Sequence, residues 1–135
     1  MTNVLIADND RDVSSLLVEL LRRAGLRATP AYDGPSAARL ARDPALRVLV
    51  CDLDMPGASG LEVLESLCDL RRPPAVMVIS GYLDDRIRTR LAALPFVHAV
   101  LGKPFDLMRF QAMVKDLAGT VGGQGGEFGV ANGEG

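Results

Sequence analysis

Two aspartates stand at the end of an apolar run of the sequence. Asp52 and Asp54 lie in VLVCDLDMPGASG, which spans residues 48–60. Burying a carboxylate is costly unless a cation or a hydrogen-bond donor pairs with it, so the run ends either in solvated acids or in a chemical site. The loop that follows holds three residues that bend the chain: Pro56, Gly57 and Gly60. They would let the backbone curl round, so that a carbonyl oxygen just after Asp52 also reaches the site.

Polar groups also end or follow three other apolar runs of the chain. These groups are Asp8, Asn9 and Asp10 near the N-terminus, Ser80, and Lys103. In an open parallel sheet the carboxyl ends of the strands lie at one edge, and ligands bind there. We therefore expect these side chains to share one crevice with Asp52.

The residue types in this crevice indicate a particular chemistry. Carboxylates at close range repel one another, so the acids need a cation, and oxygen ligands with room for water suit Mg²⁺ better than Zn²⁺. Mg²⁺, a lysine and a hydroxyl are also what phosphoryl transfer requires, because positioned positive charge and donors stabilise its transition state. In that chemistry Asp52 would be the nucleophile that forms an aspartyl phosphate.

Short apolar runs alternate with segments of helical period, a pattern typical of βα units around a parallel sheet buried on both faces. We expect strands at residues 3–7, 26–31, 47–51, 75–80 and 98–101. We expect helices between Asp10 and Gly25, from Pro35 or Ser36 to Arg42, from Ser59 or Gly60 to the RRPP segment, from about Asp84 to Leu94, and from about Asp106 to Gly119. The predicted fold class is α/β, with a doubly wound, five-stranded parallel sheet and five helices.

The helical period also predicts which side chains face the core. Among them are Leu16 in the first helix, Cys68 in the third and Leu107 in the fifth. Cys51 and Cys68 are too few for a disulfide framework and lack the spacing of a zinc site, so we expect both to be reduced and buried.

Length and composition set further limits. The chain has 135 residues, the size of one domain, which we place at residues 1–118. Residues 119–135 include 8 glycines, and this composition predicts a flexible tail or linker stub. A net charge of −2 and a pI near 5.3 give no case for direct contact with nucleic acid or a membrane. The first apolar run is too short for a signal peptide, so we expect a cytoplasmic protein.

Four motifs over residues 3 to about 118 resemble the receiver domain of two-component response regulators: VLIADND, VCDLDMPGASG, VMVISG and LGKPF. The resemblance implies a flavodoxin-like sheet of order 2-1-3-4-5. It implies that Asp52 accepts a phosphoryl group from a phosphohistidine on a sensor histidine kinase or phosphotransfer protein. The protein would be a signalling switch that catalyses only its own phosphorylation and dephosphorylation. Its target would be a downstream protein or an output domain. The resemblance also allows a homodimer.

The same resemblance implies roles for the site residues. Mg²⁺ would be held by Asp8, by Asn9, by Asp52 and by the backbone carbonyl of Asp54. Ser80 would hold a phosphoryl oxygen after a switch in its loop, and Lys103 would pair with the phosphate. The bond between Lys103 and Pro104 is usually cis in this family.

Some residues depart from the family's pattern or modify it. Asn9 stands where a second acid usually touches the metal, and the lost charge weakens Mg²⁺ binding by up to about 4 kcal/mol. Val100 stands where a Tyr or Phe usually rotates inward as Ser80 moves. We therefore expect phosphorylation to cause a smaller conformational change, or one that other residues transmit. Asp10 caps a helix and can act near the metal through water, and a bulky Tyr82 would hinder the water that hydrolyses the aspartyl phosphate.

Two other functions fit parts of the sequence. Asn9 and Val100 also fit a degenerate receiver that binds partners or dimerises without phosphorylation. Acid-labile incorporation of phosphate on Asp52 would argue against this alternative. VLVCDLDMP, followed by Ser and Lys, resembles the haloacid-dehalogenase phosphatases. In that family the aspartate motif ends the first strand and the other acids follow the lysine, whereas here the acids at 8–10 precede it.

Overall fold

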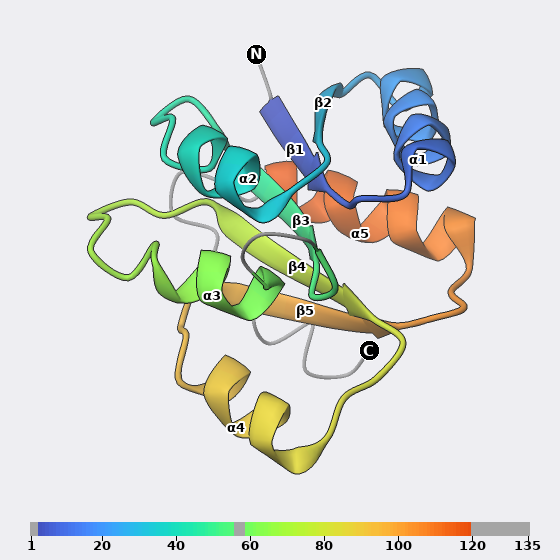
Figure 1. The fold of residues 1–135 in the computed structure, drawn as a ribbon. Helices are drawn as coiled ribbons and strands as arrows, with labels where there is room; N and C mark the ends of the chain where they lie inside the picture. Colours follow the sequence, from blue (N-terminus) through green and yellow to red (C-terminus); the bar gives the residue numbers. More distant parts are fainter. Residues whose placement is uncertain (1–2, 56–58, 120–135) are drawn as a thin grey trace.

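The computed structural model describes residues 3–55 and 59–119. Five strands form one parallel sheet in the order β2-β1-β3-β4-β5 (Figure 1). The strands are Asn3–Ala7 (β1), Arg27–Ala31 (β2), Val48–Asp52 (β3), Ala75–Ser80 (β4) and Val97–Gly102 (β5). The predicted fold class and strand order are confirmed.

Helices follow each strand. They are Arg11–Arg23 (α1), Gly34–Leu40 (α2), Gly60–Glu65 (α3), Asp85–Ala92 (α4) and Leu107–Gly119 (α5). The first four begin after a capping side chain: Asp10, Asp33, Ser59 and Asp84. Each cap accepts a hydrogen bond from a backbone N–H that has no partner within the helix, so the cap fixes where the helix begins.

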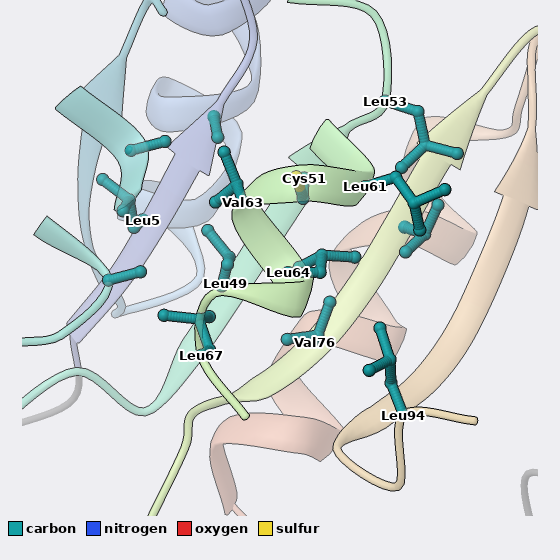
Figure 2. Packing of buried hydrophobic residues seen from close by; sticks show 14 of the residues in the cluster. Leu5, Leu49, Cys51, Leu53, Leu61, Val63, Leu64, Leu67, Val76 and Leu94 are labelled. Atoms are coloured by element: carbon teal, nitrogen blue, oxygen red, sulfur yellow. The ribbon is translucent and has the colours of Figure 1, made fainter. Parts of the chain in front are cut away.

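The helices cover both faces of the sheet. Figure 1 shows α1 and α5 on one side and α2, α3 and α4 on the other. Neighbouring residues of a strand point to opposite faces. In β3, Val50 packs in a cluster with Leu21 and Phe110, whereas Cys51 packs in a second cluster with Leu64 (Figure 2). All residues of β3 are buried for this reason.

Three side chains that the helical period predicts to be buried are exposed instead. Cys68 is exposed because α3 ends three residues before it, so its direction no longer follows the helical period. Leu16 is 50% exposed because the buried face of α1 runs through Leu17 and Leu21. Leu107 is 37% exposed as the first residue of α5. The prediction of buried cysteines is therefore correct for Cys51 alone.

Some predicted features lie outside the described residues. They include Pro56, Gly57 and all of the predicted tail except Gly119, which ends α5. Within residues 3–55 and 59–119, no helix is long and apolar enough to cross a membrane.

Candidate functional site

The carboxyl ends of four strands bring polar side chains to one edge of the sheet. Asp52 and Ser80 are the last residues of β3 and β4, while Asp8 and Lys103 directly follow β1 and β5. These strands are parallel and paired with one another across the sheet. Residues that are far apart in the chain therefore start from the same edge.

Asp52 and Lys103 are joined directly. The Lys103 Nζ donates a hydrogen bond to Asp52 Oδ2 at 2.7 Å, although 51 residues separate them. Asp52 Oδ1 accepts the backbone N–H of Asp54 at 2.9 Å. The Asp52 side chain is only 3% exposed, whereas that of Lys103 is 39% exposed. Each oxygen of this buried carboxylate thus has a donor, and one donor is a cation.

Lys103 is held in place by its backbone. Its N–H donates to the carbonyl oxygen of Ser80 at 3.0 Å, and the bond to Pro104 is cis. Burial lowers the pKa of the Lys103 ammonium, but its hydrogen bond to Asp52 and the negative charges of Asp52, Asp8 and Asp54 outweigh burial and raise that pKa overall. Lys103 is therefore a permanent cation at neutral pH.

Asp8 is the second buried acid at this edge, with an exposed fraction of 3%. Its Oδ1 accepts the N–H of Asp10 at 2.9 Å. Burial raises the pKa of Asp8, the hydrogen bond from Asp10 lowers it, and the charge of Asp52 raises it again, so the pKa is raised overall. The two buried carboxylates therefore repel one another, and Lys103 supplies one positive charge for both.

The raised pKa of Asp8 predicts a pH dependence of stability. A carboxyl group whose pKa is higher in the folded state than in the unfolded state contributes stability at low pH and loses it as the pH rises from about 3.8 through the folded value. We expect Asp8→Asn to melt a few degrees higher than the wild type at pH 7 in EDTA. Melting followed by circular dichroism measures this, and a lower melting temperature for Asp8→Asn would contradict it.

Three other predicted residues lie in the loops above this edge with exposed side chains: Asn9, Asp10 and Asp54. Asp10 caps α1, because its Oδ1 accepts the N–H groups of Asp12 and Val13 at 3.0 and 3.1 Å. The Asp54 contact with Asp52 is made by its backbone N–H.

Gly60 holds the start of α3 close to the end of β3. Its N–H donates to the carbonyl oxygen of Leu53 at 2.9 Å. A Cβ atom at this position would collide with the Asp52 carbonyl oxygen and lie 2.6 Å from Leu53 Cα. Only glycine permits this approach, so Gly60 helps to set the backbone at Asp52.

Ser80 is buried at the end of β4, and its hydroxyl bonds to its own loop. It donates to the carbonyl oxygen of Tyr82 at 2.7 Å and accepts the N–H of Tyr82 at 3.1 Å. Within the described residues no hydrogen bond joins this hydroxyl to Asp52 or Lys103. Tyr82 is 69% exposed and lines a pocket of about 350 Å³ together with Ser80 and Asp54.

Val100 lies on β5, opposite Val78 of β4, and is 40% exposed. Its side chain therefore lies on the same face of the sheet as Val78, whose buried cluster covers it only in part. The structure thus places the predicted switch position on the edge strand of the sheet, and its role in switching stays a prediction.

The donor set of this edge suits a hard divalent cation. Asp8 and Asp52 contribute two carboxylates against the single charge of Lys103, which leaves a net negative charge. Asp8 Oδ2 accepts no hydrogen bond from the described residues. The described residues contain no cluster of three or more His, Cys, Asp or Glu side chains that would hold a metal, so other ligands would be amide, carbonyl or water oxygens. Mg²⁺ accepts such a mixed oxygen set.

Ser14 is a residue that the sequence patterns did not single out. Its hydroxyl donates to the carbonyl oxygen of Asp8 at 3.0 Å, and its side chain is fully buried. The available signal was its position in α1, where Ser14, Leu17, Val18 and Leu21 share the buried face. A serine on an apolar face indicates a buried hydrogen-bond partner.

Comparisons with known proteins agree with this geometry. The family model described as the response regulator receiver domain matches residues 4–115. The transcriptional regulatory protein CpxR of Escherichia coli K12 is 31% identical over 119 residues, which cover 87% of this chain and 49% of CpxR. The sensory transduction protein RegX3 of Mycolicibacterium smegmatis is 36% identical over 117 residues, which cover 85% of this chain and 50% of RegX3. The chain thus spans about half the length of these relatives.

A solved structure shares the fold. The response regulator protein TrrA of Thermotoga maritima, crystallised in complex with Mg²⁺-BeF, superposes with a TM-score of 0.73 at 24% identity. The superposition covers 87% of this chain and 99% of that one. Since the family model covers most of the sequence, the chain belongs to the response regulator receiver domain family.

Proposed function

We propose that this receiver domain is a phosphorylation-dependent switch in which Asp52 accepts a phosphoryl group from a phosphohistidine. The donor is a sensor histidine kinase or a phosphotransfer protein. The observation that carries the proposal is the 2.7 Å hydrogen bond between Lys103 and the buried Asp52 carboxylate, beside a second buried acid. A structural ion pair would not need that second carboxylate, which costs stability.

The proposed reaction is a simple displacement. A carboxylate oxygen of Asp52 attacks the phosphorus atom, a P–O bond forms, and the P–N bond to the donor histidine breaks. The imidazole nitrogen leaves with its electron pair and takes up a proton from solvent. Lys103 remains as a fixed ammonium beside the charge that passes onto the phosphoryl oxygens.

Mg²⁺ fits this site as the cofactor. The residues that would hold it are Asp8, Asp52, the amide oxygen of Asn9 and the backbone carbonyl of Asp54. When bound, the ion supplies positive charge that offsets the two carboxylates and the incoming phosphoryl group. The Mg²⁺-BeF complex of TrrA, a protein of the same fold, supports this choice of ion.

The signal would leave the site through Ser80. Its hydroxyl must exchange its two hydrogen bonds to Tyr82 for a phosphoryl oxygen, so phosphorylation frees the loop after β4. The relatives are named as regulatory and transduction proteins, which supports the proposal that the signal passes to an output domain or a downstream protein. The domain would act in the cytoplasm, alone or as a homodimer, without touching nucleic acid or membrane itself.

The proposal is tested by incubating the wild type with acetyl phosphate and following its intact mass. We expect an acid-labile gain of one phosphoryl group with Mg²⁺ present and none in EDTA. Absence of any gain would leave the phosphorylation-independent binding module, which Asn9 and Val100 favour, as the better description.

Asn9→Asp is expected to bind Mg²⁺ more tightly than the wild type. A second carboxylate near the ion adds attraction of up to about 4 kcal/mol before hydration reduces it. Isothermal titration calorimetry at constant ionic strength measures the difference, with Arg72→Gln, an exposed site where the net charge also becomes one unit more negative, as the control. Equal affinities for the wild type and Asn9→Asp would disprove the assignment of this position to the metal.

Tyr82→Ala is expected to lose its phosphoryl group faster than the wild type. Tyr82 is exposed at the rim of the pocket that Ser80 and Asp54 line, so its ring restricts the water that reaches the aspartyl phosphate. Phosphate release after removal of the donor gives the rate. Tyr82→Phe, which keeps the ring, serves as the control and should match the wild type. An unchanged rate in the alanine variant would count against this role.

A further inference from the structure

We infer that Ser14 is a positioning residue for the Mg²⁺ site, and that its hydroxyl fixes the peptide group that joins Asp8 to Asn9. The inference rests on the proposed function, because it concerns two residues proposed to hold the ion. Ser14 itself touches neither the ion nor the phosphoryl group.

Ser14 is tied to the loop between β1 and α1 by two hydrogen bonds. Its hydroxyl donates to the carbonyl oxygen of Asp8 at 3.0 Å, and its backbone N–H donates to the carbonyl oxygen of Asp10 at 2.9 Å. Its exposed fraction is 0%, so no water competes for the hydroxyl. Ser14 therefore links the rigid first turn of α1 to the end of β1.

The carbonyl group that Ser14 holds belongs to the peptide plane between Asp8 and Asn9. The other side of Asp8 is fixed as well, since its N–H donates to the carbonyl oxygen of Ala31 at 2.9 Å. A rotation of the peptide plane would turn Asn9 and, through the shared Cα, shift the Asp8 carboxylate. The Ser14 hydroxyl opposes that rotation.

A serine at this position needs such a reason. The other buried residues of α1 are apolar: Leu17, Val18 and Leu21. A buried hydroxyl is costly unless it is hydrogen-bonded, and an alanine here would in turn leave the buried carbonyl of Asp8 without its donor. Groups that orient metal ligands without touching the metal commonly affect metal affinity strongly.

Ser14→Ala tests the inference in the full chain. We expect its Mg²⁺ affinity, measured by calorimetry, to be about tenfold weaker than that of the wild type. Phosphate uptake from acetyl phosphate at saturating Mg²⁺ should stay near the wild-type rate, because Asp52 and Lys103 do not depend on this contact. Ser14→Thr, which keeps the hydroxyl, should restore the affinity.

Ser66→Ala is the matched control. The Ser66 hydroxyl also donates to a backbone carbonyl, that of Val63 at 2.6 Å, but it lies after α3 and away from the site. Its removal should leave Mg²⁺ affinity unchanged. Where circular dichroism shows that Ser14→Ala is unfolded at the assay temperature, Ser14→Cys, with a much weaker donor of similar size, takes its place with the same expectation.

The outcomes separate this inference from the proposed function. Wild-type Mg²⁺ affinity in Ser14→Ala overturns the inference alone, and so does a weakened affinity that Ser66→Ala shares. A loss of phosphate uptake that saturating Mg²⁺ does not restore also overturns it. Failure of the wild type to bind Mg²⁺ and to take up phosphate overturns the proposed function, and the inference falls with it.

Discussion

Asp52→Asn is expected to take up no phosphate from acetyl phosphate, while Asp116→Asn takes up one phosphoryl group per chain as the wild type does. The carboxylate of Asp52 is the proposed nucleophile, and a neutral amide in its place is too weak a nucleophile to form the acyl phosphate. Asp116 is an exposed acid on α5 and controls for the loss of one negative charge. Intact mass spectrometry after incubation with Mg²⁺ measures the uptake.

The asparagine side chain keeps most of the local structure, so a loss of uptake would not reflect unfolding. Its amide oxygen can still accept the N–H of Asp54, as Asp52 Oδ1 does at 2.9 Å, but its NH₂ group replaces Oδ2, which accepts from Lys103 at 2.7 Å. Circular dichroism of both variants checks this. Uptake by Asp52→Asn at the wild-type level would mean that another carboxylate is the acceptor.

Gly60→Ala is expected to lose about 3 kcal/mol of unfolding free energy. The added Cβ would collide with the Asp52 carbonyl oxygen and lie 2.6 Å from Leu53 Cα. Both are backbone atoms, so no side-chain rotation relieves the contact, and either α3 or the end of β3 must move. Urea unfolding followed by circular dichroism gives the free energy.

Gly119→Ala is the control for this variant, since a Cβ at Gly119 has no neighbour within 4 Å. We expect it to be as stable as the wild type or more so, because alanine favours helix. Gly60→Ala should also take up phosphate more slowly at temperatures where it is folded, since Asp52 is displaced. Equal unfolding free energies for Gly60→Ala and the wild type would contradict this prediction, because they would show that α3 can shift away from β3 without loss of stability.

The sheet and the polar groups at its edge could be predicted because their signals are local in sequence. A strand buried on both faces must be apolar throughout, so β1, β3 and β4 stand out as runs. The parallel order then brings Asp8, Asp52 and Lys103 to one edge without further information. The helix starts were also readable, because Asp10 and Ser59 are caps with short polar side chains.

Other features depend on contacts that one segment does not reveal. In the sequence, Ser14 is an unexplained polar residue on an apolar helix face, and only the structure shows that it bonds to the carbonyl of Asp8. Cys68 fits the helical period, but α3 ends before it. The partner of the Ser80 hydroxyl, the backbone of Tyr82, depends on the path of the loop. These are tertiary effects, which override local periodicity.

The proposed acceptor of the phosphoryl group, Asp52, can be identified directly by chemical labelling. Reduction of the phosphorylated chain with borohydride converts an aspartyl phosphate to homoserine, and tandem mass spectrometry then locates the modified residue. We expect homoserine at position 52, and only in samples that contained both Mg²⁺ and the phosphodonor. Homoserine at position 8, 10 or 54, or an unmodified Asp52 in a chain that has gained phosphate, would contradict this expectation.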